Sequence, residues 1–292
     1  MIVVNVIGGL GNQMFQYAAG QALAQTKGQP LLLDICSFAD YRLHNGFELA
    51  RVFIGPFVLA QKQDIRRMLG WRAWSFARRV LMRRHMAWAR GKSFVLEPHF
   101  HYWEGLFAAP EDCHLAGYWQ SESYFKHIET TIRQAFVFKH PLTGKNAEVA
   151  AQIAKGNAVS LHIRRGDYAK DSKTHVTHGL LPLSYYQMAV MRVTQAIGNP
   201  RFFVFSDDID WARKNLRLDS LCEFIDHNQG IDSYRDMQLM SLCDHHIIAN
   251  SSFSWWGAWL NTRAEKIVIA PKKWFANRLD TQDLYPQGWV KL

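Results

Sequence analysis

The sequence lacks the features of a disulfide-bonded or membrane-spanning protein. Its four cysteines lie far apart and form no CxxC pair, so reduced thiols are expected. It has no uncharged apolar run of about 18 residues or more, so no transmembrane helix is expected. The N-terminal stretch MIVVNVIGGLGNQ lacks the basic start of a signal peptide and predicts a first β-strand. These absences favour a cytoplasmic protein.

Acidic residues are scarce, and most of all in one segment. The chain has 34 Lys and Arg against 25 Asp and Glu, a net charge of +9. Residues 66–92 hold nine Lys and Arg and no acid, while Trp71, Trp74, Leu81 and Trp88 share roughly one face of a predicted helix. This helix either contacts an anionic membrane or acidic glycolipid at the inner face of the cytoplasmic membrane, or packs its tryptophans inward. No nucleic-acid-binding motif accompanies the charge, so no nucleic acid partner is expected.

What the chain does have is ample apolar residue content, 48% hydrophobic and 13% aromatic, which predicts a globular protein of one large or two medium domains. In the second half, apolar β-rich runs alternate with helical patterns, which favours a parallel sheet with right-handed crossovers. The runs lie near 158–163, 202–206, 222–226, 245–249 and 266–270.

The first half begins in the same manner and then becomes irregular. A strand at 2–7, a glycine loop, a helix at about 12–27 and a strand at 31–35 follow one another. The polar stretch KHPLTGKNAE marks a boundary. We therefore expect an N-terminal domain over 1–145 and a C-terminal domain over 146–292.

Three polar segments follow strands of the second half and are expected to line one crevice, because ligands bind beyond the carboxyl ends of parallel strands. They are HIRRGDY, FSDDID and ANSSFSWW. Arginine matches phosphate oxygens bidentately, so Arg164 suits a phosphate, while Arg165 is expected to face back toward Asp167 or another acid. The alternative is an ion pair that closes the strand end.

The serines and aspartates of the other two segments allow several roles. Ser251 and Ser252 precede a helix expected near Ser254, where they could bind an anion or serve as N-caps. Asp207 and Asp208 could accept hydrogen bonds from a nucleoside, hold a metal or cap the next helix. No group of His, Cys and carboxylates has the spacing of a metal site.

The glycine loop GGLGNQMFQ opens the first helix but is no dinucleotide fingerprint. Met14 stands where a third glycine would be needed, and the lysine of a P-loop is missing. A nicotinamide or ATP site is therefore disfavoured, and a tight loop facing a ligand is favoured.

Together, GGLGNQMFQYA, HIRRGDY and IIANSSFSWWGAWL resemble the bacterial α-1,2-fucosyltransferases over nearly the whole chain. The resemblance implies an α/β fold of GT-B type, with two Rossmann-like domains facing across a cleft. It implies transfer of fucose from GDP-β-L-fucose to the 2-hydroxyl of a galactose-type acceptor, with inversion and with no cofactor or required metal. Segment 36–115 matches least and is expected to carry acceptor specificity.

The resemblance also assigns site residues by position. Arg164 would be catalytic, contacting the β-phosphate, and a preorganised cation there would stabilise the charge of the departing GDP. The implied donor-binding residues are Gly9, Gly11, Asn12, Gln13, His162, Arg165, Asp207, Asp208, Ser251, Ser252 and Phe253. Among these, His162 and an Asp of SDD would contact the nucleoside.

The catalytic base and the acceptor stay open at this stage. Asp171, Glu48 and His44 are candidate bases, and a dissociative reaction assisted by the β-phosphate oxygen is the alternative. The acceptor could be an O-antigen precursor, a lipid-linked oligosaccharide or another galactose-containing oligosaccharide or glycolipid. Rival functions are a transferase that makes a different linkage or uses another GDP-sugar, and a basic binding protein without catalysis.

Overall fold

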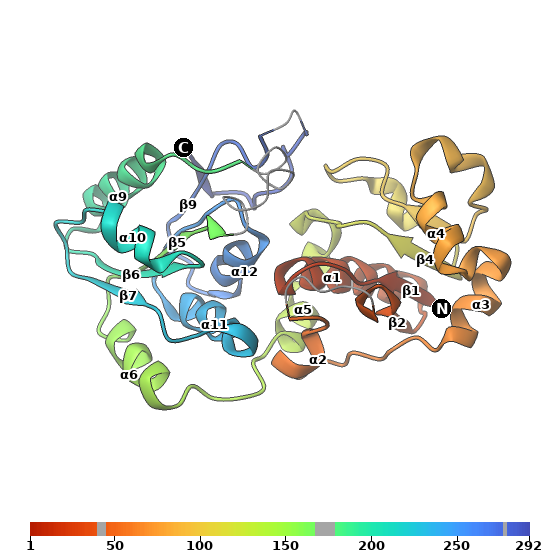
Figure 1. The fold of residues 1–292 in the computed structure, drawn as a ribbon, viewed down its shortest axis with the longest axis horizontal. Coiled ribbons are helices and arrows are strands. Elements are labelled where there is room, and N and C mark those ends of the chain that lie inside the picture. Colours follow the sequence, from red (N-terminus) through yellow and green to blue (C-terminus); the bar gives the residue numbers. More distant parts are fainter. Residues whose placement is uncertain (40–44, 167–178, 277–278) are drawn as a thin grey trace. The chain divides into compact units, whose positions relative to one another are not determined.

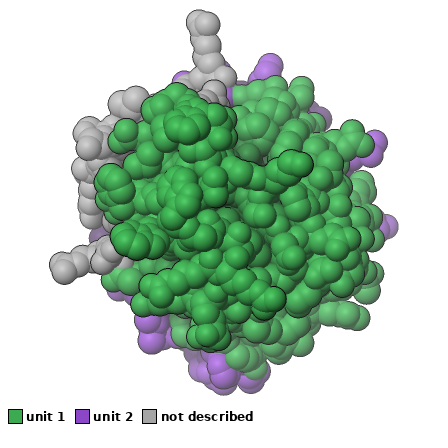
Figure 2. Space-filling view, turned by 90° about the vertical axis from the view of Figure 1, so that its right-hand side faces the viewer, with its two compact units in different colours: residues 1–139, 280–284 green, residues 140–279, 285–292 purple. Residues whose placement is uncertain are grey.

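The computed structural model describes residues 1–39, 45–166, 179–276 and 279–292. The chain forms two compact α/β units (Figure 2). Unit 1 comprises Met1–Lys139 with Asp280–Leu284, and unit 2 comprises His140–Leu279 with Tyr285–Leu292. The chain thus passes from one unit to the other at 139/140, slightly before the expected boundary at 145/146.

Unit 1 is built on a four-stranded parallel sheet in the order β2-β1-β4-β3. Figure 1 labels β1, β2 and β4 of this sheet. Helix α1 (Leu10–Lys27) connects the first two strands and ends where Gly28 adopts φ 62°. It packs closely on the sheet, since a Cβ at Gly20 would lie 2.2 Å from Val4. The strands are β1 (Ile2–Asn5), β2 (Leu31–Asp34), β3 (Phe94–Leu96) and β4 (Cys113–Ala116).

The rest of unit 1 consists of short helical pieces. The α-helices are α2 (Leu49–Val52), α3 (Lys62–Leu69), α4 (Ser75–Leu81) and α5 (Glu129–Ala135). The 3₁₀ turns are η1 (Cys36–Ala39), η2 (Gly70–Ala73), η3 (Arg84–Ala89), η4 (Glu104–Ala108), η5 (Glu122–Tyr124) and η6 (Lys126–Ile128). The prediction of one helix over the basic segment 66–92 is therefore wrong. Gly70, with φ 58°, ends α3, and η2, the short helix α4 and η3 follow as separate elements.

Unit 2 is built on a six-stranded parallel sheet in the order β10-β9-β8-β5-β6-β7. Its strands are β5 (Ala158–Ile163), β6 (Arg201–Ser206), β7 (Cys222–Ile225), β8 (His245–Ile247), β9 (Val268–Ala270) and β10 (Val290–Lys291). Its helical elements are α6 (Gly144–Ile153), α9 (Leu183–Ile197), α10 (Ile209–Asn215), η7 (Gly230–Asp232), α11 (Tyr234–Leu242) and α12 (Ser252–Leu260). The chain leaves β5 for β6 on one side and later returns to β8 on the other. The carboxyl end of β5 is therefore a topological switch point.

Strand β5 is buried along its whole length because helices cover both faces of the sheet. Val159, Leu161 and Ile163 pack with residues of α9 in one cluster. Ala158 packs in a second cluster with residues of α6 and α11. Within the described part of the chain, no helix has the length and apolar character needed to cross a membrane.

Candidate active site

Arg164 follows β5 directly, and a carboxylate from the neighbouring strand orients it. Its Nε lies 3.1 Å from Oδ2 of Asp207, which follows β6. Oδ1 of Asp207 accepts a hydrogen bond of 2.8 Å from the backbone N–H of Arg165. A Cβ at Gly166 would lie only 3.0 Å from Oδ2 of Asp207, so glycine suits this close approach. The ion pair that the sequence allows at the end of this strand is thus present. Asp207 also holds in place the loop of Arg164, Arg165 and Gly166, which we call the arginine loop.

Arg165 lies against an aromatic ring of the next helix. Its guanidinium carbon lies 3.8 Å from the ring centroid of Trp211 on α10. This distance is typical of a cation–π contact, in which the planar guanidinium stacks on the indole. Asp167, the acid suggested as its partner, lies outside the described residues. Asp207 and Trp211 together fix the backbone and the side chain of Arg165.

His162 and Phe253 come together from two different segments of unit 2. Their ring centroids are 6.0 Å apart, with His162 near the end of β5 and Phe253 in the first turn of α12. His162 is 5% exposed. Burial and the nearby positive charge of Arg164 lower the pKa of His162 to about 3. The imidazole is therefore neutral at physiological pH and can donate or accept hydrogen bonds without carrying charge.

Helix α12 begins at Ser252, earlier than the predicted start near Ser254. Ser251 occupies the N-cap position, but its side chain makes no capping hydrogen bond. The simple capping role considered for Ser251 is therefore not what the geometry shows. Ser251 is 8% exposed, and Ser252 is partly exposed in the first turn. This turn follows β8, the strand next to β5, and its N–H groups and hydroxyls form an environment suited to an anion.

Asp208 caps the helix after β6. Its Oδ1 accepts a hydrogen bond of 3.3 Å from the backbone N–H of Trp211, and Asp208 is the N-cap of α10. Its own N–H donates to the hydroxyl of Ser206. Of the three roles open to the SDD aspartates, capping describes Asp208. Asp207 has a further one, because it orients the side chain of Arg164. Among the described residues, no three or more His, Cys, Asp or Glu side chains gather as a metal site would require.

In unit 1, the glycine loop is tied down from within. Gly8 has φ 80° and Gly9 is the N-cap of α1. Gln13 is fully buried, and its Nε2 donates to the carbonyls of Gly8 at 2.9 Å and Gly46 at 2.8 Å. Its Oε1 accepts from the N–H of Glu48 at 2.9 Å. Gln13 therefore organises the loop through three backbone contacts.

The neighbours of Gln13 differ in exposure. Gly11 is buried in the first turn of α1, whereas Gly9 and Asn12 are partly exposed. Oδ1 of Asn12 accepts a hydrogen bond of 2.8 Å from Nε2 of Gln120, which is 6% exposed. Asn12 thus connects the glycine loop to the segment that follows β4.

Glu97 lies at the carboxyl-terminal edge of the unit 1 sheet, and the sequence motifs did not indicate it as a site residue. It directly follows β3, and its Oε2 and Oε1 accept hydrogen bonds from the N–H groups of Tyr118 at 2.7 Å and Trp119 at 2.9 Å. A Cβ at Gly117 would lie 2.5 Å from the Cβ of Glu97, so the segment after β4 is shaped around this side chain. Burial raises the pKa of Glu97 to about 7, although the two N–H contacts act in the opposite direction.

The backbone beside Glu97 is strained. Trp119 is fully buried and has φ 56°, a left-handed conformation that tryptophan rarely adopts. Residues held in this region cluster at functional sites, because the surrounding structure must hold them there. The signal for Glu97 in the sequence is the apolar run FVL followed by an acid, the same pattern of strand and polar end seen in unit 2.

Of the candidate bases predicted from the sequence, only Glu48 lies within the described residues. It is 3% exposed, and its Oε1 accepts hydrogen bonds from Arg51 at 2.7 Å and from Asn45 at 3.3 Å. Burial raises its pKa, which the contacts with Asn45 and Arg51 partly offset. Glu48 is thus enclosed and ion-paired, whereas Glu97 is partly exposed. His44 and Asp171 lie outside the described residues.

Comparisons with known proteins identify relatives of the chain and structures of similar fold. The chain is 36% identical to an α-1,2-colitosyltransferase of Escherichia coli, with 100% of this chain and 99% of the relative covered. It is 32% identical to the O-antigen biosynthesis glycosyltransferase WbnK of Escherichia coli, with 98% of each covered. A crystal structure of the fucosyltransferase NodZ from Bradyrhizobium superposes with a TM-score of 0.51 at 15% identity, covering 89% of this chain and 91% of that chain.

The likeness to NodZ concerns the fold, and it confirms the predicted α/β fold class of GT-B type. The family resemblance carried by the three motifs is confirmed as well. Residues 1–292 match the family described as Glycosyl transferase family 11. The chain therefore belongs to Glycosyl transferase family 11 and is a glycosyltransferase.

Proposed function

We propose that this enzyme transfers L-fucose from GDP-β-L-fucose to the 2-hydroxyl of a galactose-type acceptor, with inversion at the sugar C1. The observation that carries the proposal is the Arg164–Asp207 pair at the switch point of the unit 2 sheet, where the Nε–Oδ2 distance is 3.1 Å. A cation held in place there suits the pyrophosphate of a nucleotide sugar. A bovine relative, galactoside 2-alpha-L-fucosyltransferase SEC1, is 27% identical over 89% of this chain.

On the donor side, Arg164 stabilises the leaving group. When the C1–O bond breaks, its electron pair goes to the β-phosphate, and the guanidinium offsets the growing negative charge. Asp207 keeps Arg164 oriented beforehand, so little reorganisation is needed during the reaction. Neutral His162 and the ring of Phe253 contact the nucleotide, and the hydroxyls of Ser251 and Ser252 add donors at the N-terminus of α12.

On the acceptor side, Glu97 is the general base. The acceptor 2-hydroxyl gives its proton to a carboxylate oxygen of Glu97 as the new C1–O bond forms. Each carboxylate oxygen has two lone pairs, so each can accept a further hydrogen bond beside its contact with Tyr118 or Trp119. A base with a pKa of about 7 is well matched to proton abstraction at neutral pH. Asn12 faces the donor together with the glycine loop, and Gln120, whose Nε2 is hydrogen-bonded to Asn12, binds an acceptor hydroxyl.

A second donor is favoured by one specific relative. The α-1,2-colitosyltransferase is 36% identical over the whole chain, and colitose is L-fucose without its 3-hydroxyl. A site that hydrogen-bonds the 3-hydroxyl would reject the deoxy sugar by about 10⁴-fold. GDP-fucose and GDP-colitose should therefore differ in kcat/KM, and steady-state kinetics measures this difference.

The test uses purified enzyme with GDP-fucose, GDP-colitose and GDP-mannose, each paired with β-galactosides, followed by linkage analysis of the product. We expect an α-1,2-linked product, with GDP-fucose giving the highest kcat/KM. In Arg164→Lys, kcat should fall by roughly 100-fold, because a point charge cannot reproduce a fork of donors. GDP binding should weaken less. A higher kcat/KM with GDP-colitose would assign colitose, and the absence of transfer from every donor would refute the proposal.

The proposed acceptor also bears on location. During polysaccharide assembly, a galactose-containing acceptor that is linked to a lipid lies at a membrane surface. We propose that the enzyme works in the cytoplasm at the inner face of that membrane, in peripheral contact with it.

A further inference from the structure

Unit 1 exposes large aromatic side chains in η2, in and just before α4, and in η3. Trp71 is 59% exposed, Trp74 72%, Phe76 75% and Trp88 82%. By contrast, Trp119 and the tryptophans of α12 are buried. The interpretation in which the tryptophans of segment 66–92 pack inward is therefore wrong. Exposed aromatic side chains that line one pocket, as Trp71, Trp74 and Phe76 do, indicate an interaction site.

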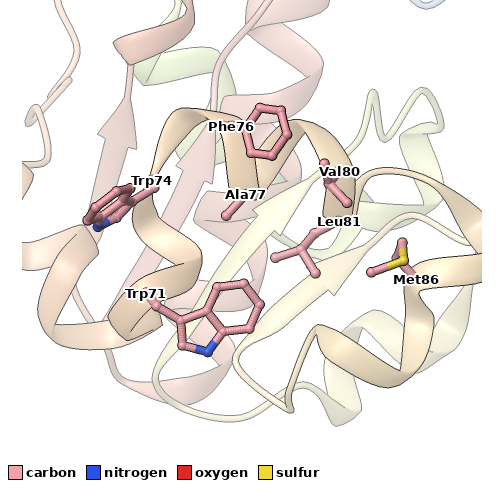
Figure 3. Close-up of a pocket in the computed structure, with 7 residues that line it drawn as sticks. All are labelled: Trp71, Trp74, Phe76, Ala77, Val80, Leu81 and Met86. Carbon is pink, nitrogen blue, oxygen red and sulfur yellow. The ribbon is translucent and has the colours of Figure 1, made fainter.

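The same segment forms a pocket of about 340 Å³ without polar walls (Figure 3). Its lining residues come from η2, from α4 and its N-cap, and from η3, and all are apolar: Trp71, Trp74, Phe76, Ala77, Val80, Leu81 and Met86. This volume lies within the range of sites that hold small ligands. The lining offers no hydrogen-bonding side chain besides indole N–H groups, so a sugar or nucleotide is a poor match. A hydrocarbon chain is a good one.

Among the side chains of the segment that the structure describes, five basic ones are exposed: Arg66, Arg67, Arg79, Arg83 and Lys92. With no Asp or Glu between residues 66 and 92, nothing within the segment neutralises them. The apolar pocket and exposed aromatics are thus flanked by positive charge. We call residues 66–92 the basic aromatic surface.

Other arginines of the segment serve its internal structure. Arg78 forms an ion pair with the buried carboxylate of Asp34, which also accepts a hydrogen bond from His114 at 3.0 Å. Burial alone would raise the pKa of Asp34, but the His114 contact and the charge of Arg78 hold it well below its usual range.

Two further arginines bind backbone carbonyls within the segment. Arg72 donates to the carbonyl of Ala89. Arg90 likewise donates to the carbonyls of Leu81 and Arg83. These contacts hold η2, α4 and η3 in place, so the exposed aromatic side chains lie on an ordered surface.

We propose that the basic aromatic surface docks on a bilayer containing anionic phospholipid, with an acyl chain entering the apolar pocket. Tryptophan rings suit the interface between headgroups and acyl chains, and exposed arginines suit lipid phosphates. A nucleic acid would use the charge but leave the apolar pocket unmatched. A second copy of the chain, at net charge +9, would bring two positive surfaces together. The anionic bilayer is the occupant that satisfies both the charge and the pocket.

The test is co-sedimentation of the full chain with vesicles of phosphatidylcholine alone or with phosphatidylglycerol, over a range of salt. We expect binding only to the vesicles that contain phosphatidylglycerol, with salt weakening it because exposed charges are screened. Brominated acyl chains in those vesicles should quench tryptophan fluorescence, since the exposed rings reach the acyl region. Binding without quenching would contradict insertion, and equal binding to both vesicles would contradict the role of charge.

Two variants separate charge from aromatic contact. Changing Arg66, Arg67, Arg79 and Arg83 to Gln should weaken vesicle binding by on the order of 100-fold, because each arginine near the surface contributes several-fold. The matched control removes the same charge from exposed residues of unit 2, by changing Lys155, Arg192, Lys214 and Arg217 to Gln. Arg78 is left intact because its loss would uncover buried Asp34. An equal loss in the control would show that net charge alone drives binding.

The aromatic variant changes Trp71, Trp74 and Trp88 to Ser and should abolish the quenching by brominated lipid. Its control changes Met188, Met191 and Leu221 to Ser, apolar residues of unit 2 that are 46%, 55% and 75% exposed. Sedimentation velocity without lipid tests the rival occupant. A dimer that the aromatic variant abolishes, together with no vesicle binding, would assign the surface to self-association. Transfer to a water-soluble galactoside should continue in all these variants, so failure of docking is distinct from failure of the proposed transferase activity.

Discussion

At the scale of single residues, two roles were considered for Arg164: an ion pair at the strand end and a cation that stabilises the leaving group. The contact with Asp207 makes these two roles compatible. The ion pair is partly exposed, with side chains 24% and 22% accessible, and pairs of this kind stabilise a fold by only about 0–1 kcal/mol. Its larger effect is geometric, because one carboxylate fixes both the Arg164 guanidinium and the Arg165 backbone. A cation held in one orientation can meet developing phosphate charge without first reorganising. The structural contact thus supports the catalytic role.

The neighbouring aspartates give a matched test of this role. Asp207→Asn keeps the shape but removes the charge that orients Arg164, so we expect kcat to fall by about 10-fold to 100-fold. Asp208→Asn should leave kcat nearly unchanged, because asparagine is as good an N-cap as aspartate. Steady-state kinetics and thermal melts on both variants decide. The opposite ranking would move the functional role from Asp207 to Asp208.

Glu97 makes activity depend on pH in a defined direction. The base must be ionised, so kcat should rise with pH through an apparent pKa near 7 and then level off. In Glu97→Gln, kcat should drop by about 10²-fold to 10⁴-fold and lose this rise. Glu48→Gln is the control with another buried carboxyl of unit 1 and should retain the profile. A pH profile of Glu97→Gln that matches the parent enzyme would remove Glu97 from the role of base.

The same ionisation affects stability with the opposite trend. Burial raises the pKa of Glu97 in the folded state, so folding favours the protonated form. The stability that this group contributes is therefore fully present below its usual pKa, and it is lost as pH rises through about 7. Activity from Glu97 rises over a range in which its contribution to stability falls. Comparing the melting temperatures of Glu97→Gln and the parent at pH 5 and pH 8 separates the two effects.

At the scale of secondary-structure elements, the sequence was most informative where strands are long and buried. The run at 158–163 matches β5, because helices on both faces leave an uninterrupted apolar strand. The polar residues after β5, β6 and β8 were predicted to share one edge of the sheet, and the parallel pairing brings His162 beside Phe253 and Arg164 beside Asp207.

Short strands and long-range contacts escaped prediction for physical reasons. Strand β3 is apolar but has only three residues, and β4 contains the buried His114, so neither gives an apolar run long enough to predict a strand. Glu97 was missed with them, because its partners Tyr118 and Trp119 follow a different strand. The contact of Arg165 with Trp211 likewise depends on where α10 lies, which spacing along the chain does not specify. Sequence patterns predicted which elements meet but not which side chains pair.

The glycine loop illustrates how one side chain positions an element. We expect Gln13→Leu to lower the free energy of unfolding by about 3 kcal/mol, because it leaves the Gly8 and Gly46 carbonyls and the Glu48 N–H without their partner. Asn12→Ala loses one partly buried contact and should cost about 1 kcal/mol. Urea denaturation of both variants measures these changes. A smaller loss in Gln13→Leu than in Asn12→Ala would show that the loop is held by other contacts.

At the scale of the whole molecule, positive charge is supplied by the chain itself. The net charge is +9, and the arginines at the end of β5 place part of it at the proposed donor phosphates. Of the three acids after β6 that could hold a divalent ion, two are engaged elsewhere, Asp207 with the arginine loop and Asp208 with the N-terminus of α10. The third, Asp210, is exposed in the first turn of α10. A metal ion bound by these carboxylates would therefore compete with the arginine loop for Asp207 and with the N-terminus of α10 for Asp208.

We therefore expect transfer to continue at an unchanged rate in excess EDTA, because Arg164 can offset the leaving-group charge that a metal offsets in other enzymes. The measurement is the initial rate with and without EDTA, alongside a metal-dependent transferase in the same buffer as the positive control. If activity disappears and Mn²⁺ or Mg²⁺ restores it, Asp208 and Asp210 become the candidate ligands. Asp208→Asn would then reduce activity far more than its role as a helix cap allows. The same variant that serves as a neutral control for Asp207 thus also decides between arginine and metal as the source of charge.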